Sequence, residues 1–122
     1  MSLLSDYNIL QYIEEGSIKI TGNIYIQYCA VDLEVEGTHI LEAGDKLVVR
    51  TKNIIKLPDF LVANVVGRSR YARKGLNVTP QLIHPGFEGH ITLKLENTSS
   101  NAIKIYDGTL IASISFKNIN SL

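Results

Sequence analysis

The feature that most constrains the fold is a succession of short alternations between apolar and polar residues. In residues 90–95 the apolar side chains Ile91, Leu93 and Leu95 alternate with polar neighbours. Such alternation places the apolar side chains on one face of a β-strand. Further short stretches, separated by turns rich in Gly, Asn and Asp, are residues 18–20, 24–26, 31–35, 47–49, 60–66, 103–105 and 110–116. Many short strands at this spacing predict a mainly all-β sandwich or barrel.

Two stretches depart from simple alternation. Residues 60–66 are mostly apolar and rich in β-branched side chains, which predicts a strand covered on both faces. Residues 5–15 predict the one helix: Ser5 is a good N-cap, Asp6 places negative charge at the positive end of the helix dipole, and Gly16 is suited to end it.

Composition narrows the class of protein. The 122 residues fit one domain, residues 1–122, and Lys plus Arg equal Asp plus Glu at 12 each. A net charge of zero argues against binding long nucleic acid, yet it leaves room for a local anion pocket. Cys29 is the only cysteine, so no intrachain disulfide forms, and we expect it to be a small buried residue. With no apolar run long enough to span a bilayer and no signal-like N-terminus, we expect a cytoplasmic protein without membrane contact.

Residues 67–75 form a basic segment flanked by glycines. Four of the chain's 12 cationic residues fall within seven of these positions. Glycines let backbone N–H groups approach a ligand, a serine hydroxyl adds a donor, and arginines bind phosphate oxygens in pairs. This combination suits a triphosphate. A solvated basic turn, or a patch that touches RNA phosphates, explains the same residues equally well.

Several motifs in order along the chain resemble the dCTP deaminase/dUTPase family. Residues 67–76 (GRSRYARKGL) are similar to its phosphate motif G-R-S-S-x-A-R-x-G-L, and residues 83–97 (IHPGFEGHITLKLEN) to its I-D-P-G-[FW]-x-G-x-I-T-L-E-L-x-N segment. Weaker matches are residues 4–6 with 16–18, residues 27–33, residues 57–58 and residues 106–112. The opening Leu-Ser-Asp and the Pro-Gly-Phe favour the dCTP deaminase branch.

The resemblance implies a distorted jelly-roll β-barrel with one short N-terminal helix, assembled as a homotrimer with sites between subunits. It implies that Arg68, Ser69 and Arg73 hold the phosphates of dCTP or dUTP together with Mg²⁺. Thr79 begins a hairpin over residues 79–86 against which the base and sugar rest, and Ser113 stands where the family has a phosphate-contacting glutamine. A zinc deaminase is excluded, because those enzymes need a Cys-x-x-Cys pair.

The family's catalytic carboxylates are replaced. Lys94 stands at the position of the glutamate that activates water in dCTP deaminases, and a lysine is cationic at neutral pH and so a poor base. His84 stands at the position of the dUTPase aspartate; an imidazole can act as a base, although a solvated or packing role suits this turn as well. Glu96 lies about 6.6 Å further along the strand than Lys94, too far to replace the missing group without a shift in strand register. An ion pair with Lys94 or a surface position is the favoured role for Glu96.

Two further expectations concern the ligand. The glycine-rich motif of the family's C-terminal arm has no counterpart in these 122 residues, so we expect a bound nucleotide to be poorly shielded from water. Tyr71 and Tyr106 could stack on a base, although packing in the barrel is the favoured role of both.

Three functions remain open from the sequence. The first is a nucleotide-binding family member with reduced or lost catalysis. The second is an active dCTP deaminase, which forms dUTP and ammonia from dCTP and water, or a dUTP diphosphatase, with His84 or Glu96 in the catalytic role. The third is a non-catalytic structural or regulatory trimer that binds a protein partner.

Overall fold

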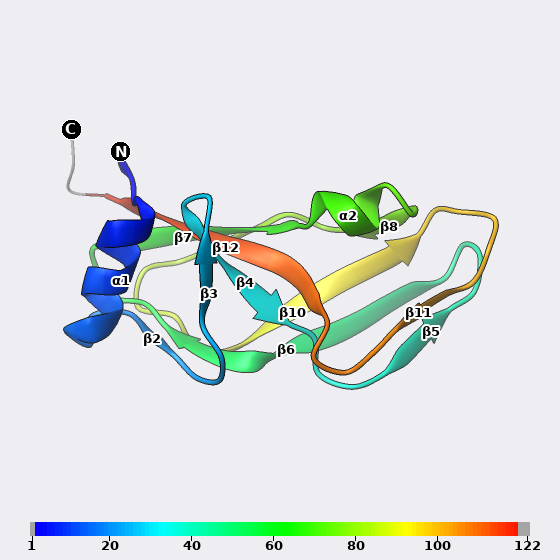
Figure 1. Cartoon of the computed structure of the whole chain (residues 1–122), viewed down its shortest axis with the longest axis horizontal. Coiled ribbons are helices and arrows are strands. Elements are labelled where there is room, and N and C mark those ends of the chain that lie inside the picture. The colour runs from blue at the N-terminus through cyan, green and yellow to red at the C-terminus, as the bar shows by residue number, and fades with distance from the viewer. Residues whose placement is uncertain (1, 120–122) are drawn as a thin grey trace.

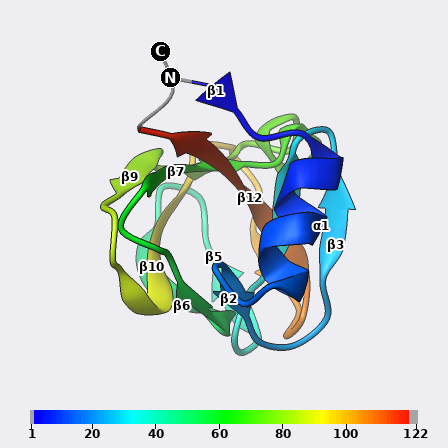
Figure 2. The same ribbon diagram turned by 90° about the vertical axis from the view of Figure 1, so that its left-hand side faces the viewer.

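The computed structural model describes residues 2–119, with one helix near the start and strands through most of the remainder. Helix α1 (Asp6–Glu14) begins at Ser5, whose hydroxyl oxygen accepts a hydrogen bond from the N–H of Asn8 at 3.1 Å. The helix predicted over residues 5–15 is therefore confirmed. Ile9 is fully buried beneath it. In Figures 1 and 2, α1 lies at one end of the molecule, next to β3 (Tyr25–Gln27).

Two sheets build the barrel, and a short ribbon extends it at the end opposite α1 (Figure 1). The six-stranded sheet has the order β3-β4-β12-β7-β9, with β1 paired to β12: β4 (Ala30–Glu34), β12 (Leu110–Asn118), β7 (Leu61–Gly67), β9 (Gln81–Ile83) and β1 (Ser2–Leu3). The four-stranded sheet has the order β2-β6-β10-β8: β2 (Lys19–Ile20), β6 (Lys46–Lys56), β10 (Glu88–Asn97) and β8 (Leu76–Val78). The ribbon pairs β5 (His39–Leu41) with β11 (Ile103–Ile105).

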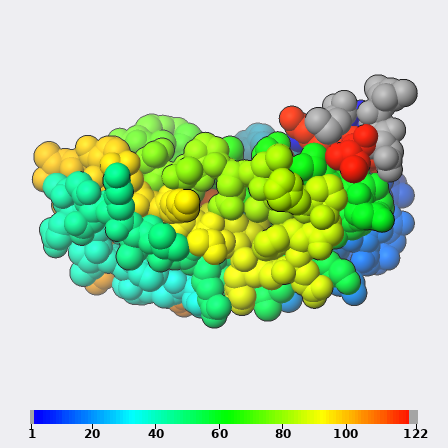
Figure 3. All heavy atoms as spheres, turned by 180° about the vertical axis from the view of Figure 1, so that it is seen from behind, coloured from blue at the N-terminus to red at the C-terminus, as the bar shows by residue number. Residues whose placement is uncertain are grey.

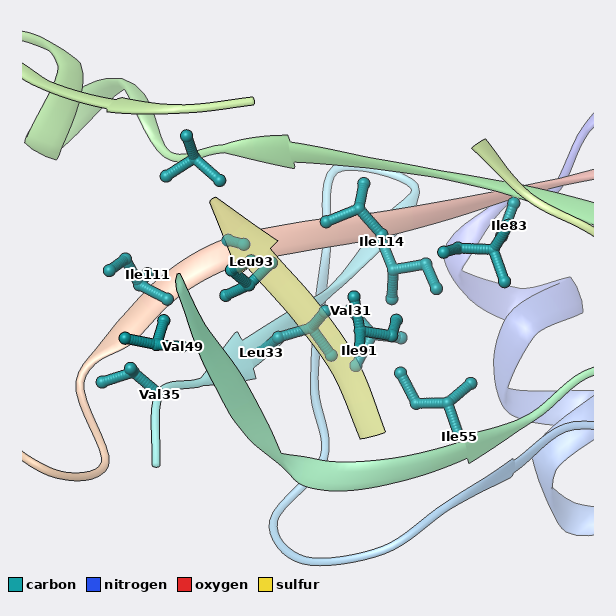
Figure 4. Close-up of a cluster of buried hydrophobic side chains, with 14 of the residues drawn as sticks. Val31, Leu33, Val35, Val49, Ile55, Ile83, Ile91, Leu93, Ile111 and Ile114 are labelled. Carbon is teal, nitrogen blue, oxygen red and sulfur yellow. The ribbon is translucent and has the colours of Figure 1, made fainter. Parts of the chain in front are cut away.

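The core lies between the inner faces of the two sheets. Val31 and Leu33 of β4 are fully buried and face Ile91 and Leu93 of β10, as Figure 4 shows. On each strand the intervening polar residues point outward, as the period of two requires. The predicted mainly-β, curled jelly-roll architecture with a short N-terminal helix is confirmed.

From β6 to β10 the chain changes sheet at every connection. β6, β8 and β10 belong to the four-stranded sheet, whereas β7 and β9 belong to the six-stranded sheet. The segment 79–86 is therefore not a hairpin, contrary to what the resemblance implied: β8 pairs with β10, and β9 pairs with β7. Likewise β2 pairs with β6, and β3 with β4, so the turn near Gly22 joins strands of different sheets.

The structure also contains short elements that the sequence pattern did not predict. β1, β5, β8 and β9 were not predicted, and β6 extends from Lys46 to Lys56, well beyond the predicted residues 47–49. Part of the basic segment forms a helical turn, α2 (Ser69–Ala72), where we predicted a loop. Neither helix within residues 2–119 is long and apolar enough to cross a membrane.

One expectation about β7 is not met within a single chain. Leu61, Ala63 and Val65 are fully buried, but the residues between them are only partly covered, and Val66 is 47% exposed. The apolar outer face of β7 is thus left open in the monomer.

Candidate functional site

The largest pocket, about 440 Å³, opens on the outer face of the six-stranded sheet. It lies where the β3–β4 hairpin meets the end of β7 and the middle of β12. Its walls come from residues 27–30 and 66–69, together with Leu3, Asp32, Ser113 and Ser115. Three of the five residues predicted to bind the nucleotide therefore line one pocket, namely Arg68, Ser69 and Ser113.

Asp32 is a buried, fully hydrogen-bonded carboxylate in the wall of this pocket. Its side chain is only 4% exposed, and both carboxylate oxygens accept hydrogen bonds: Oδ1 from Ser113 Oγ at 2.8 Å and Oδ2 from Gln27 Nε2 at 2.9 Å. Arg68 Nε lies 3.8 Å from Oδ1. A buried charge needs such partners to remain stable. The alternation in residues 31–35 predicted that Asp32 points away from the core, but not that Gln27, Arg68 and Ser113 bury it there.

Arg68 keeps most of its hydrogen-bonding capacity. A guanidinium carries five N–H donors. Within residues 2–119 the only hydrogen bond it donates is a long one, 3.5 Å from Nη1 to the carbonyl oxygen of Leu110, in addition to its ion pair with Asp32. Its side chain is 27% exposed, so it is fixed at the pocket wall and still reachable. Arg68 can therefore bind an anion while it keeps its ion pair with Asp32 and its hydrogen bond to Leu110.

Gly67 allows a close approach at the point where β7 enters this segment. A Cβ on Gly67 would lie 3.0 Å from Val78 Cβ, because β8 passes directly beside it. The close approach brings the start of α2 against the barrel and sets Arg68 and Ser69 at the pocket. Arg73, by contrast, is exposed and does not line the pocket; its Nη2 lies 3.5 Å from Ser69 Oγ.

The two tyrosines considered for base stacking lie elsewhere. Tyr71 packs against the core and lies beneath the cations of its own segment, with Arg70 at 6.0 Å and Lys74 at 5.6 Å from the ring centre. Tyr106 lies beneath Lys104 at 4.9 Å. Neither lines the large pocket. The aromatic residue that does so is Tyr28, which the sequence analysis missed.

Tyr28 and Cys29 form the tip of the β3–β4 hairpin. Cys29 is partly exposed, so the prediction of a buried cysteine is wrong; a two-residue turn leaves no interior for its side chain. The N–H of Cys29 donates to Asp6 Oδ1 at 2.7 Å, which fastens the tip to the first turn of α1. Both residues have positive φ, 53° and 62°, and the sequence carries no glycine or asparagine here to signal the turn.

Thr79, the fourth predicted contact, lies on the other sheet. It lines a pocket of about 350 Å³ with Lys94 and Glu96, and its N–H donates to the carbonyl oxygen of Lys94 at 3.0 Å. Figure 3 shows this side of the molecule, where the yellow atoms of β10 lie beside the yellow-green atoms of the segment before it. Within residues 2–119 the side chains of Lys94 and Glu96 make no ion pair, so the pairing favoured from the sequence is not formed.

His84 lies in a third place. It is exposed in a turn in which its carbonyl oxygen accepts a hydrogen bond from the N–H of Phe87 at 3.2 Å. It lines neither the pocket of Arg68 nor that of Lys94. One chain therefore separates the phosphate residues, the Thr79–Lys94 pair and His84.

The perturbed titratable groups lie outside these pockets. Arg50 donates a hydrogen bond to Glu36 and holds the pKa of that carboxyl below its usual value of 4.5. Hydrogen bonds from Lys52 and from the N–H of Gly37 lower the pKa of Asp107 in the same way. Among the described residues no three His, Cys, Asp or Glu side chains are grouped so as to hold a metal ion.

Comparison with known proteins identifies relatives over most of the chain. A family model described as "dCTP deaminase-like" matches residues 30–119. A dUMP-forming dCTP deaminase of Methanosphaera stadtmanae is 31% identical over 160 residues, covering 99% of this chain and 81% of the relative. A dUMP-forming dCTP deaminase of Coprothermobacter proteolyticus is 37% identical over 94 residues, covering 75% of this chain. The chain spans only about half the length of that second relative.

Solved structures with the same fold are dUTPases. A point mutant of the dUTPase of Staphylococcus aureus phage phi11, described with a structural Mg(II) ion, superimposes with a TM-score of 0.76 at 15% identity, covering 86% of this chain and 92% of that one. The native EIAV dUTPase gives 0.73 at 23% identity, covering 86% and 91%. At these identities the likeness establishes the fold.

Proposed function

Because this chain belongs to the dCTP deaminase-like family, we propose that it binds the phosphates of a pyrimidine deoxynucleoside triphosphate, dCTP or dUTP, and that its catalysis is reduced or lost. The observation that carries the proposal is Arg68, a fixed guanidinium with spare donors in the largest pocket. Ser69 and Ser113 add hydroxyl groups to the same wall. Arg73, one turn of chain away and exposed, can add a second positive charge.

Mg²⁺ would enter with the nucleotide rather than bind beforehand. Both oxygens of Asp32 already accept hydrogen bonds, and the described residues hold no group of three metal ligands. Mg²⁺ often binds through substrate phosphates and keeps several waters, so it needs few protein ligands. The phage phi11 dUTPase, which shares the fold, is described with a structural Mg(II) ion, so Mg²⁺ is found in a protein of this fold.

The two replaced positions support the proposal of reduced or lost catalysis. Lys94 has an exposed ammonium group, which donates hydrogen bonds and cannot accept a proton from water. His84 is exposed and lies outside the pocket of Arg68. No carboxylate of the described chain replaces them in either pocket, apart from the engaged Asp32 and the displaced Glu96.

The complete site would form between copies in a homotrimer. Arg68 and Thr79 line different pockets on different sheets of one chain, so one chain alone does not bring them to the same ligand. The outer face of β7 leaves Val66 47% exposed beside the pocket, and Leu82 of the neighbouring β9 is 53% exposed. We propose that a second copy covers this face and contributes its own Thr79–Lys94 segment to the site of Arg68.

The test compares two arginines of the same segment. Calorimetry with dCTP, dUTP and inorganic triphosphate, each with Mg²⁺, should show binding by the wild type and by Arg70→Ala, whose side chain lies on Tyr71 outside the pocket. Arg68→Ala should weaken binding at least tenfold, because it removes charge-assisted hydrogen bonds.

Products of the same mixtures are separated by chromatography. Binding without dUTP, dUMP or ammonia supports the proposal. Robust turnover would show that the chain is an active enzyme, and an absence of binding by the wild type would leave the third function, a trimer that binds protein.

A further inference from the structure

The tip of the β3–β4 hairpin holds an aromatic side chain in an unfavourable backbone conformation. Gln27 pairs with Ala30, so the turn consists of Tyr28 and Cys29 alone, and both have positive φ. Turns of this kind favour Asn followed by Gly, because Gly has no Cβ and Asn tolerates positive φ better than most other residues. Residues held in such conformations cluster at ligand-binding and active sites.

The Tyr28 ring has no role in holding the barrel together. It is 90% exposed, the most exposed large hydrophobic residue of the described chain. The backbone beneath it is nevertheless fixed on both sides, because Cys29 N–H donates to Asp6 and Gln27 Nε2 donates to the buried Asp32. The structure therefore presents an almost wholly uncovered aromatic ring on an anchored hairpin tip.

That ring lies at the edge of the pocket proposed for the phosphates. Tyr28, Arg68 and Ser69 all line it. The pocket thus combines hydrogen-bond donors, which suit the phosphates of a nucleotide, with an aromatic surface, which suits its base. An aromatic ring stacks on any nucleobase, because each base has a π-face.

We propose that Tyr28 packs flat on the pyrimidine ring of the nucleotide whose phosphates are held at Arg68 and Ser69. The inference rests on the proposed function and names a specificity-determining residue for it. Since stacking does not depend on the hydrogen-bonding edge of the base, Tyr28 adds affinity for dCTP and dUTP alike. It favours nucleotides over bare polyphosphates.

The first test uses the absence of tryptophan from the sequence. Tyr28→Trp introduces a single tryptophan at the hairpin tip, whose fluorescence reports on contact with a base. We expect saturable quenching with dUTP and with dCTP, and none with inorganic triphosphate at concentrations that saturate the phosphate site. Equal responses to dUTP and triphosphate would overturn the proposal.

The second test separates the ring from the backbone. Tyr28→Asn suits the positive φ, so we expect a higher melting temperature together with about tenfold weaker binding of dUTP and unchanged binding of triphosphate. Tyr28→Phe keeps the ring and should bind dUTP within about twofold of the wild type. The same dUTP affinity in Tyr28→Asn and in the wild type would overturn the stacking role, and so would a change in oligomeric mass caused by Tyr28→Asn.

Binding of inorganic triphosphate distinguishes a failure of the Tyr28 role from a failure of the proposed function. A wild type that binds triphosphate and dUTP equally well contradicts the role of Tyr28 alone. A wild type that binds neither contradicts the proposed function, and the role of Tyr28 with it.

Discussion

Charged residues lie on the outer faces of both sheets, but they differ in how far they are buried and in how many partners they have. On the six-stranded sheet, Asp32 has a 4% exposed side chain with Gln27, Arg68 and Ser113 as partners. On the four-stranded sheet, Arg50 and Lys94 are exposed and Glu96 is half-buried. Arg50 pairs with Glu36, which follows β4, with side chains 54% and 42% exposed, and within residues 2–119 Lys94 makes no ion pair.

The difference shows that the contribution of a charged pair to stability depends on how far the pair is buried. A buried carboxylate that loses a partner keeps its desolvation cost, whereas an exposed one is solvated by water instead. The first face is therefore built before any ligand arrives. Substitutions on the second face should cost the fold little, because its side chains are already solvated.

The strongest way to break this comparison is to remove the central carboxylate. Asp32→Ala leaves the side-chain donors of Gln27, Arg68 and Ser113 without their acceptor, and we expect the free energy of unfolding to fall by about 2–3 kcal/mol. Glu96→Ala on the opposite sheet should change it by no more than about 0.5 kcal/mol. Urea unfolding followed by circular dichroism measures both, and equal losses would contradict the contrast between the faces.

A smaller effect is expected within the pocket itself. Ser113→Ala removes one hydrogen bond to Asp32 and should cost about 1 kcal/mol. Ser115 lines the same pocket but makes no side-chain hydrogen bond within residues 2–119, so Ser115→Ala is the matched control. We expect the control to unfold within about 0.5 kcal/mol of the wild type. If the two variants unfold alike, the Asp32 network is weaker than its geometry indicates.

On the solvated face, Lys94→Glu should alter chemistry rather than stability. The side chain is exposed and has no partner to lose within residues 2–119, so we expect the unfolding free energy to stay within about 0.5 kcal/mol. The change restores a proton acceptor at the family glutamate position, and ammonia release from dCTP should rise above that of the wild type. An unchanged rate would mean that another position limits deamination.

The smallest effect concerns the exposed ion pair. Arg50 depresses the pKa of Glu36, so the pair stabilises the fold above about pH 4.5, the usual value for this carboxyl, and that contribution is lost as pH falls through the lower folded pKa. In low salt, the stability of the wild type should therefore decline more steeply below pH 4.5 than that of Glu36→Gln. High salt should remove most of the difference, because exposed pairs are screened. Identical acid profiles in low salt would show that the pair contributes nothing.

The sequence predicted the strands that are long enough to alternate and the helix that carries a cap. It did not predict β8 and β9, nor that the two strands belong to two sheets rather than one hairpin. Pairing partners depend on contacts far apart in the chain.

The candidate site was predictable only in part, because local motifs identify residues but do not show which sheet each residue lies on. Arg68, Ser69 and Ser113 were found from local motifs and meet in one pocket, whereas Thr79, expected with them, lies on the other sheet. The burial of Asp32 in that pocket was missed because alternation reports which way a side chain points, not what covers it. Tyr28 was missed because its turn uses residues that ordinarily avoid positive φ.

The exchange of strands between sheets from β6 to β10 has a consequence for how the protein opens. Val78 and Gln81 are three positions apart and are held in different sheets, so fraying either sheet pulls on the other through Thr79 and Pro80. Amide hydrogens of β7 and β10 should therefore exchange with deuterium through one shared opening event rather than two. We therefore expect the barrel to open as a single cooperative unit, and a ligand that holds Arg68 at the end of β7 to slow exchange on the far sheet as well.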